Sequence, residues 1–453
     1  MAKLPKIQAC DKSFSSYGGL FLIKELLESL KLGSQLEPHL PKTPKLSRSN
    51  LDKFESLVLG FIAGNEHLDN WLVSNENAVI QALQNRTYGP KSLGDFLRQF
   101  TGEQVLELRR LMIELSFEIR SRLGMDSNRF ILDIDSSSHE QYGQRMEGVE
   151  YCYKKFLALD SITAYDDLGL CYWQDVRPGS TYSSNGCSQI IHEIFSRMPS
   201  ERTRKGSRAV RKIVRADSAF SKDEFYNACR VKHLGFVCAA KKNDGVKDKI
   251  ARIKNWKPQD PDDPTRILAT GGRECEIGHI AHHTKGYDGV LRLVVMRAKR
   301  PPEPGVMFTD YSQYDYYAFV TNMGKDEYCD VELIKLYRGR GNAENMIKEQ
   351  KYGFDLKHFP CQKLTANKAF GLIASFAYNL TRLMGLADPR KKKTKKGTIE
   401  IVPFAKRLRQ QVLLLPVQVI CHAGAVVFRY GRDHYRRIVH WQKIFKTYQF
   451  GSS

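Results

Sequence analysis

Hydrophobic residues recur at three- and four-residue intervals through the first part of the chain, which is the spacing of one face of an α-helix. Three segments carry this spacing clearly, namely GGLFLIKELLESL (18–30), NLDKFESLVLGFIAG (50–64) and SLGDFLRQF (92–100). Ser92 is the expected N-cap of the third segment. A longer helical run follows at 101–124 and ends at a glycine. The pattern predicts a helical N-terminal region over residues 1–125.

The pattern then changes to short apolar runs separated by polar turns, which is typical of strands. The predicted strands are 129–135, 153–163, 169–179, 211–220 and 234–240, and the predicted helices between them are 184–198 and 222–233. Three successive strands followed by alternating helices and strands predict a mixed α/β sheet. Residues 126–240 are therefore expected to form the first part of a mixed-sheet core.

Proline-rich stretches interrupt that rhythm in residues 241–315, and the strand-like run GVLRLVVMRA lies between them. We interpret this segment as a β-rich insertion. Residues 316–385 are expected to complete the core, with a returning strand and a strongly apolar helix at 366–385. The remainder, 386–453, is interpreted as a basic loop, RKKKTKK (390–396), followed by a C-terminal region of mixed helix and strand signals.

Charge narrows the possible partners. The formal net charge is +21 and the sequence pI is about 9.4, which favours a polyanion such as nucleic acid over a membrane surface. No apolar run is long enough to span a bilayer, and the first residues lack the apolar segment of a signal peptide. The ten cysteines form no CxxC pair, which indicates reduced thiols in a cytosolic protein.

Three acidic residues have positions that suggest chemistry. Asp135 is expected at the end of the first strand, Asp217 at the end of the fourth, and Glu344 in a helix after the sheet. Carboxylates on one sheet edge can converge, and such a cluster repels itself unless it holds divalent cations. Oxygen ligands favour Mg²⁺ or Mn²⁺, and two such ions are the usual device for in-line phosphodiester displacement.

Each acid also has an ordinary interpretation. An Asp at a strand end is usually a turn or cap residue, and Glu344 could form a surface ion pair with Lys348. Asp133 points to the same side of its strand as Asp135, because side chains alternate with a period of two, so Asp133 is the alternative first ligand.

The segment around Glu344 combines the acid with cations. If it forms one helix, five residues fall within an arc of about 80°, namely Tyr337, Arg340, Glu344, Lys348 and Lys351. A metal-binding carboxylate would then share a face with cations able to bind phosphates. Gly339 and Gly341 weaken the early part of this helix, which is expected to begin near Asn342.

The spacing Tyr337-x2-Arg340-x3-Glu344-x6-Lys351 resembles the Y-R-E-K signature of bacterial insertion-sequence transposases of the DDE class. LDIDSS and VRADSAF resemble the blocks around the two aspartates of that family, although serine follows the first aspartate where the family often has threonine. LVLGFIAGNEHLDN, YRGRGNAENMIKEQKYGF and FAYNL resemble further family segments. The resemblance extends from about residue 15 to residue 385.

This resemblance implies an RNase H-like core, a helical DNA-binding region at the N-terminus, and Mg²⁺-dependent cleavage and joining of DNA. It implies a catalytic and metal-binding triad of Asp135, Asp217 and Glu344. Further implied are DNA contacts from Tyr337, Arg340 and Lys351. The expected partners are the terminal inverted repeats of the element and the target DNA, bound by a homodimer at the nucleoid of a bacterial cytoplasm.

Other features have weaker interpretations. Lys348 is a possible DNA contact or a solvated base, and Trp256 could either stack on an unpaired base or pack within the insertion. Cys275, His279, His282 and His283 match no standard zinc spacing and are interpreted as ordinary loop residues.

Two rival functions share parts of this pattern. A nuclease or resolvase of the same fold would cut DNA without joining it. A non-catalytic DNA-binding protein derived from a transposase would have lost an acid of the triad, and all three acids are present.

Overall fold

A computed structural model describes residues 12–42, 49–71, 83, 88–125, 129–143, 145–199, 210–259, 266–301, 313–394, 397–422 and 425–450. The chain divides into two compact units. Unit 1 comprises Met1–Gly124, Gln141–Val149 and Lys348–Ser453, and unit 2 comprises Met125–Glu140 and Glu150–Ile347. Helix α12 (Gly341–Gly353) contributes residues to both units.

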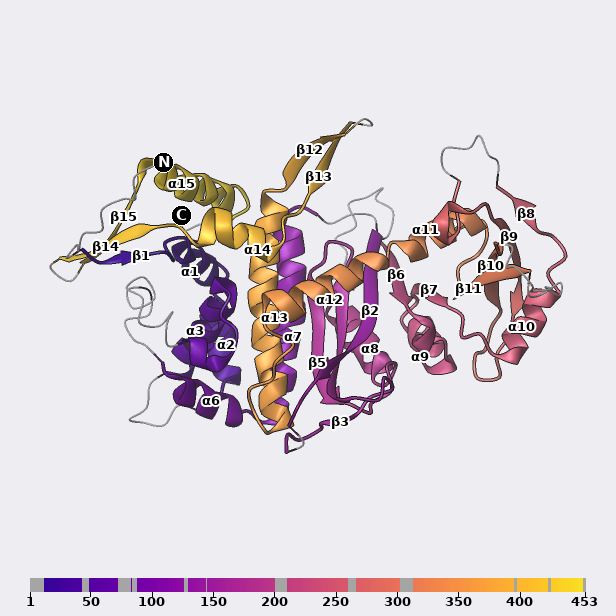
Figure 1. Ribbon diagram of the computed structural model, residues 1–453, viewed down its shortest axis with the longest axis horizontal. Coiled ribbons are helices and arrows are strands. Elements are labelled where there is room, and N and C mark those ends of the chain that lie inside the picture. Colours follow the sequence, from indigo (N-terminus) through magenta and orange to yellow (C-terminus); the bar gives the residue numbers. More distant parts are fainter. Residues whose placement is uncertain are drawn as a thin grey trace, which may run out of the picture. The chain divides into compact units, whose positions relative to one another are not determined.

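Unit 1 is built mainly from helices. Its helices are α1 (Leu20–Ser29), α2 (Leu32–Leu36), α3 (Asn50–Ala63), α6 (Pro90–Arg98), α7 (Gly102–Arg122), α13 (Leu364–Ala387), α14 (Ala405–Leu408) and α15 (Arg432–Thr447). Its strands are β1 (Phe14–Ser15), β12 (Arg390–Thr394), β13 (Gly397–Ile401), β14 (Val417–His422) and β15 (Ala425–Tyr430). The long apolar helix α13 is the centre of the unit and packs against α3, α6 and α7 (Figure 1).

Local signals explain where the N-terminal helices begin and end. The Ser49 side chain accepts hydrogen bonds from the first turn of α3, and Gly64 ends that helix with a left-handed φ of 93°. Thr101 and Gln104 form a capping box at the start of α7. The expected cap at Ser92 is wrong, because α6 begins two residues earlier at Pro90, whose missing N–H suits the first helical position.

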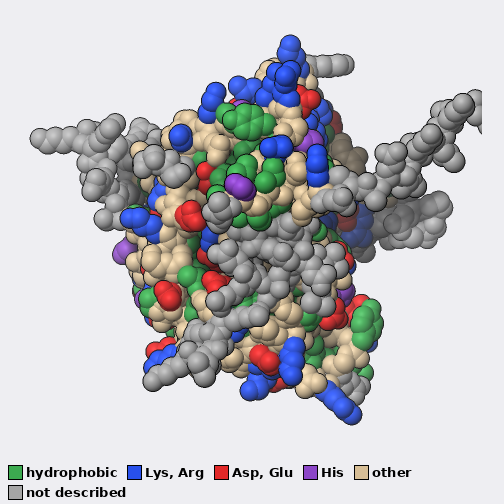
Figure 2. Space-filling model, turned by 90° about the vertical axis from the view of Figure 1, so that its left-hand side faces the viewer, with side chains coloured by type: hydrophobic (Ala, Val, Ile, Leu, Met, Phe, Trp, Pro, Cys, Tyr) green, Lys and Arg blue, Asp and Glu red, His purple; other side chains and the backbone are tan. Residues whose placement is uncertain are grey.

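The interpretation of the basic run 390–396 as a loop is also wrong in the part that the structure describes. Arg390 to Thr394 form strand β12, which pairs antiparallel with β13. All described side chains of both strands are exposed, so the cations are solvated and their repulsion is screened. Helix α15 also belongs to unit 1. Figure 2 shows Lys and Arg side chains gathered at the top of the face of the molecule that carries this helix.

Unit 2 contains one large mixed sheet. Its strands are β2 (Arg129–Glu140), β3 (Glu150–Tyr151), β4 (Leu157–Asp166), β5 (Cys171–Pro178), β6 (Arg211–Ala216), β7 (Gly235–Ala239), β8 (Lys257–Pro258), β9 (Glu276–His282), β10 (Leu291–Lys299) and β11 (Tyr314–Thr321). Its helices are α8 (Cys187–Arg197), α9 (Asp223–Val231), α10 (Asp244–Ala251) and α11 (Asp330–Arg338). In the described residues the order is β3-β4-β2-β6-β7-β11-β10-β9-β8, with β5 paired to β4.

The direction of the strands divides this sheet. Strands β5, β4 and β2 form an antiparallel meander, and β6 and β7 lie parallel to β2. Strand β11 returns antiparallel to β7 and is extended by β10 and β9. The described strands of the expected insertion therefore continue the main sheet.

The two faces of the sheet are covered by different helices. Phe130 on β2 packs against Phe195 of α8. The next residue, Ile131, belongs to a core cluster on the opposite face that includes Leu333 and Leu336 of α11. This alternation sends every second residue of β2 towards α11, which determines where Asp133 and Asp135 lie. No helix among the described residues is long and apolar enough to cross a membrane.

Candidate active site

The candidate site is built on two neighbouring parallel strands, β2 and β6. In their register Ile131 pairs with Ile213 and Asp133 pairs with Arg215. Their parallel ladder ends one residue further on, and side chains of one face repeat every second residue. Asp135 on β2 and Asp217 after β6 are therefore the next pair on the same face. An apolar pair is followed by an ion pair and then by two carboxylates.

The sequence pattern predicted that Asp135 ends its strand, and this prediction is wrong. Strand β2 continues to Glu140, because the serines after Asp135 pair with β4. What ends near Asp135 is the pairing with β6, which stops at Ile134. The missing neighbour on that side leaves room for side chains from elsewhere in the unit.

The inner aspartate, Asp133, is fully paired. Arg215 donates from Nε and Nη2 to the two oxygens of Asp133, at 2.6 Å each, and both side chains are buried. The remaining nitrogen, Nη1, donates to the backbone oxygen of Leu336 at 2.7 Å. Burial raises the pKa of Asp133, and the pair with Arg215 opposes that effect. This arrangement ties the Asp133–Arg215 pair to the end of α11.

Gly339 is part of the same arrangement. A Cβ at this position would lie 2.4 Å from Nη1 of Arg215, whose guanidinium is already held at three atoms. Only glycine allows the guanidinium to approach the end of α11 this closely. The sequence carried a signal for Arg215, because it stands two residues before Asp217 as Asp133 stands two before Asp135.

The outer aspartate, Asp135, has a different environment. Its Oδ1 accepts the backbone N–H of Ser136 at 2.9 Å, and its Oδ2 lies 3.3 Å from Nη2 of Arg340. Burial is the main reason that the pKa of Asp135 is raised to about 6. The charges of Asp217 and Glu344 raise this pKa further, and the guanidinium of Arg340 lowers it. The three acids are thus electrostatic neighbours, and Arg340 lies against Asp135.

The other two acids come from the starts of helical turns. Asp217 accepts the backbone N–H of Ala219 at 2.9 Å and caps the short turn Ser218–Phe220. Glu344 lies in the first turn of α12, where its charge is favourable to the helix dipole. Both positions hold a carboxylate at a helix N-terminus.

Tyr337 and Glu344 do not share one helix, so the shared face expected from a single helix is wrong, whereas the expected start of the Glu344 helix near Asn342 is confirmed to within one residue. Tyr337 is the penultimate residue of α11, which is capped at Gly339, and α12 begins at Gly341. The Tyr337 ring packs on Phe319 with 4.7 Å between the ring centroids. Burial raises the pKa of Tyr337 to about 12, so its hydroxyl stays protonated at neutral pH. Arg340 lies in the turn between the two helices.

Comparison with known families decides what kind of protein carries this site. The chain matches the family described as transposase DDE domain group 1 over residues 6–440. The protein belongs to this family of DDE transposases. A search of curated proteins gives no match. The family implies a nuclease or transferase activity and suggests DNA as the partner, in keeping with a net charge of +21.

The remaining predicted contacts of the transposase lie in different settings. Lys348 and Lys351 follow Glu344 on α12 by four and seven residues, which is one and two helical turns. Trp256 is half-buried beside β8, with the guanidinium carbon of Arg297 4.1 Å from its ring centroid. Strand β8 is the sixth strand along from β2, roughly 29 Å away at about 4.8 Å per strand. Trp256 is therefore not grouped with the acids.

The residues with loosely zinc-like spacing do not form a cluster in the transposase. Cys275 contacts the backbone oxygen of Ile267, and His279 pairs with Asp330 at 2.7 Å. The Nδ1 of His282 lies 3.0 Å from the Lys249 ammonium. His279 and His282 lie three residues apart on strand β9, and side chains alternate between the two faces of a strand, so these two histidines point to opposite faces.

Proposed function

We propose that this DDE transposase cleaves the ends of its element and joins them to target DNA by Mg²⁺-dependent phosphodiester transfer. The observation that carries the proposal is the register of β2 and β6, which aligns Asp135 with Asp217 beyond a buried ion pair. The antiparallel meander β5-β4-β2 followed by parallel β6 and β7 supports an RNase H-like core.

The three acids have the chemistry of a magnesium or manganese site. Asp135, Asp217 and Glu344 offer only carboxylate oxygens, the donors that these hard cations prefer. Burial, and then the charges of Asp217 and Glu344, raise the pKa of Asp135 in spite of Arg340, and a bound cation would offset both effects. Two bound ions would activate the attacking oxygen and stabilise the leaving one. One oxygen from each acid cannot be chosen so that all three lie within 4.8 Å of one another. The three carboxylates would therefore have to move closer together to bind the ions.

The protein groups around the acids would hold the DNA strand. Arg340 is nine-tenths buried, and its Nε has no hydrogen-bond partner among the described residues. This nitrogen could donate to a phosphate oxygen beside Asp135. The protonated hydroxyl of Tyr337 could donate to the same strand.

Other contacts would extend the DNA interface. Lys348 and Lys351 would hold backbone phosphates along α12, and Trp256 would stack on a base only if its strand reached the β8 edge. The helical region 1–125 would recognise the terminal inverted repeats. Two ends must be joined, so we expect a homodimer on DNA, acting at the nucleoid in the bacterial cytoplasm.

The chemistry needs no nucleotide energy source. In the first step a water oxygen bonds to phosphorus and the strand leaves as a 3′-hydroxyl. In the second step that hydroxyl attacks a target phosphodiester, so one phosphodiester replaces another. The chain accordingly has no G-x4-GK[ST] phosphate loop.

The test uses purified protein, Mg²⁺ and DNA that carries the flanking ends of the element. We expect cut ends and, with target DNA present, joined products. Cut ends without joined products would favour a nuclease or resolvase. Binding without cleavage would favour a non-catalytic DNA-binding protein.

A further inference from the structure

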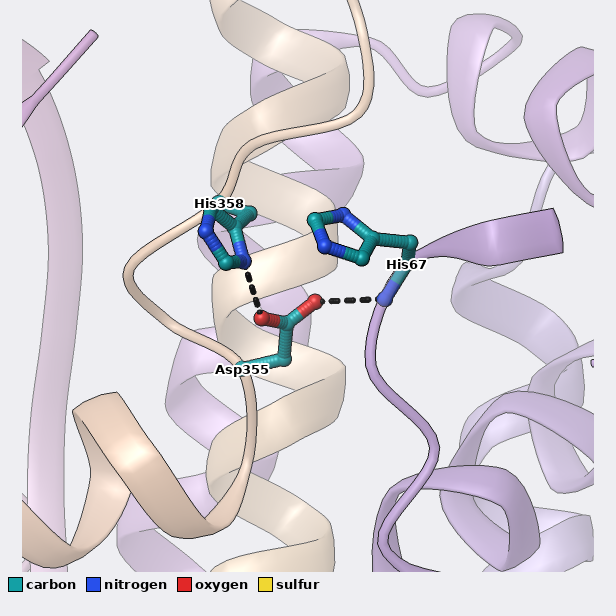
Figure 3. Close-up of side chains that lie close together, drawn as sticks. All are labelled: His67, Asp355 and His358. Carbon is teal, nitrogen blue, oxygen red and sulfur yellow. Dashed lines mark hydrogen bonds and ion pairs between the residues drawn. The ribbon is translucent and has the colours of Figure 1, made fainter. Parts of the chain in front are cut away.

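A second cluster of charged side chains lies in unit 1 and takes no part in the proposed chemistry. His67 follows α3, and Asp355 and His358 follow α12. One ligand atom from each of the three lies within 4.8 Å of the other two, and this is the group that meets that condition among the described residues. Figure 3 shows both histidine rings beside the Asp355 carboxylate.

The carboxylate holds the two segments together. Its Oδ1 lies 2.7 Å from Nδ1 of His358, and its Oδ2 accepts the backbone N–H of His67 at 2.8 Å. The two imidazole rings lie against each other, with 4.2 Å between centroids and 30° between planes. The bond to Asp355 comes from the backbone N–H of His67, so the His67 ring does not take part in it.

The cluster is open on the histidine side. The Asp355 side chain is 1% exposed, whereas the His358 side chain is 39% exposed and His67 is exposed. A cavity of about 360 Å³ adjoins the three residues. A small ion could therefore reach the ring nitrogens while the carboxylate stays in place.

The backbone is held in an unusual conformation at two of the three residues. His67 has a φ of 58° and Asp355 a φ of 53°, in a region that residues other than glycine seldom adopt. Such conformations persist where the surrounding structure imposes them. Here the two residues in this conformation are joined directly, by the hydrogen bond from the His67 N–H to the Asp355 carboxylate.

We propose that His67, Asp355 and His358 bind one first-row transition-metal ion of the Zn²⁺ class. Two imidazole nitrogens and one carboxylate oxygen suit zinc, whereas Mg²⁺ prefers oxygen ligands alone. Three protein ligands leave a position for water on the cavity side. The ion would link the segment after α3 to the segment after α12, and the site shares no residue with the three acids of unit 2.

The experiment titrates Co²⁺ into metal-free full-length protein and records visible d–d absorption, with Zn²⁺ as competitor. It uses an Asp135→Asn background, so that the carboxylate site contributes less. His67→Asn and His358→Gln are the test variants. Asparagine tolerates the left-handed backbone and keeps the N–H that bonds Asp355, and glutamine keeps a donor for the same carboxylate.

His279→Gln is the matched control, because His279 also pairs with a carboxylate at 2.7 Å but belongs to no group of three possible ligands among the described residues. We expect one equivalent of Co²⁺ with intense visible bands that Zn²⁺ displaces, an affinity lowered about 100-fold or more in each test variant, and an unchanged control. Zn²⁺ should raise the Tm of the control and not that of His358→Gln.

Absence of the visible bands would overturn the proposal and leave a hydrogen-bonded His–Asp–His contact without metal. Equal affinities in the control and both test variants would overturn it as well. These measurements contain no DNA, so their outcome does not depend on whether the protein cleaves or joins strands.

Discussion

The two halves of strand β2 use aspartate in different ways. The half that ends at Ile134 lies between β4 and β6, and its aspartate, Asp133, is closed off by Arg215. The half that begins at Asp135 does not pair with β6. The Asp135 carboxylate feels the negative charges of Asp217 and Glu344 and forms one ion pair, at 3.3 Å, with Arg340. Arg215 donates to both oxygens of Asp133, whereas Asp135 has a single ion pair at 3.3 Å with Arg340, so we propose that Asp135 and not Asp133 is open to a cation.

The largest effect is expected when the acids of the proposed triad are neutralised. Asp135→Asn and Glu344→Gln each remove a proposed metal ligand with little change in volume. We expect cleavage to fall by several orders of magnitude, while binding to the element ends stays within a few fold. Cleavage assays and gel-shift titrations would measure the two quantities. Cleavage at wild-type rates in either variant would refute the assigned triad.

The inner acid should show the reverse pattern. Asp133→Asn leaves Arg215 buried without a full partner, and breaking such a pair costs about 3–5 kcal/mol of unfolding free energy. Asp135→Asn should leave that free energy unchanged or higher, because burial and the charges of Asp217 and Glu344 disfavour the ionised carboxylate more than Arg340 favours it. Urea unfolding at neutral pH gives both values. We expect the folded Asp133→Asn variant to retain measurable cleavage. Complete loss of cleavage in this variant at normal stability would instead make Asp133 the metal ligand.

Gly339 sharpens the comparison from the side of α11. Gly339→Ala would push its Cβ against Arg215, and we expect a loss of about 1–3 kcal/mol together with slower cleavage, since Arg340 is displaced. Gly341→Ala is the control, because a Cβ there meets nothing within 4 Å and alanine favours the helix. Thermal unfolding would separate the two, and equal Tm values would argue against a tight contact at Gly339.

The cations near Glu344 should change DNA binding by a smaller amount. If Arg340 and Lys351 hold phosphates, replacing either by alanine should reduce the salt slope of DNA binding by about one unit. Lys335→Ala, on the exposed side of α11, should leave the slope unchanged. Unchanged slopes for both Arg340→Ala and Lys351→Ala would assign these residues to packing or solvation.

Trp256 lies far from both halves of β2 and should give the smallest effect. Its ring packs under Arg297, a contact worth about 0.5–1 kcal/mol, so Trp256→Ala should lower the Tm slightly. We expect first-strand nicking and second-strand processing to fall equally. A selective slowing of second-strand processing, relieved by an abasic site next to the cut, would instead support stacking on an extruded base.

Several elements could be predicted from the sequence because their signals are local. The three-to-four periodicity of 50–64 and 366–385 matches helices α3 and α13. The regions that differ from the prediction depend on pairing with another strand or on competing helix caps. Arg390–Thr394 forms a strand only because β13 pairs with it, and β2 extends past Asp135 only because β4 follows it.

The sequence by itself determined the family, the mixed α/β class and the order of the acidic residues, since these follow from motifs and from local periodicity. Only the tertiary structure showed that Asp133 and Asp135, which point to one face, have different partners, because Arg215 of the neighbouring strand pairs with Asp133 alone. It also brought His67 to Asp355 across 288 positions of sequence. Such contacts depend on how distant segments pack, and neither spacing nor composition records that packing.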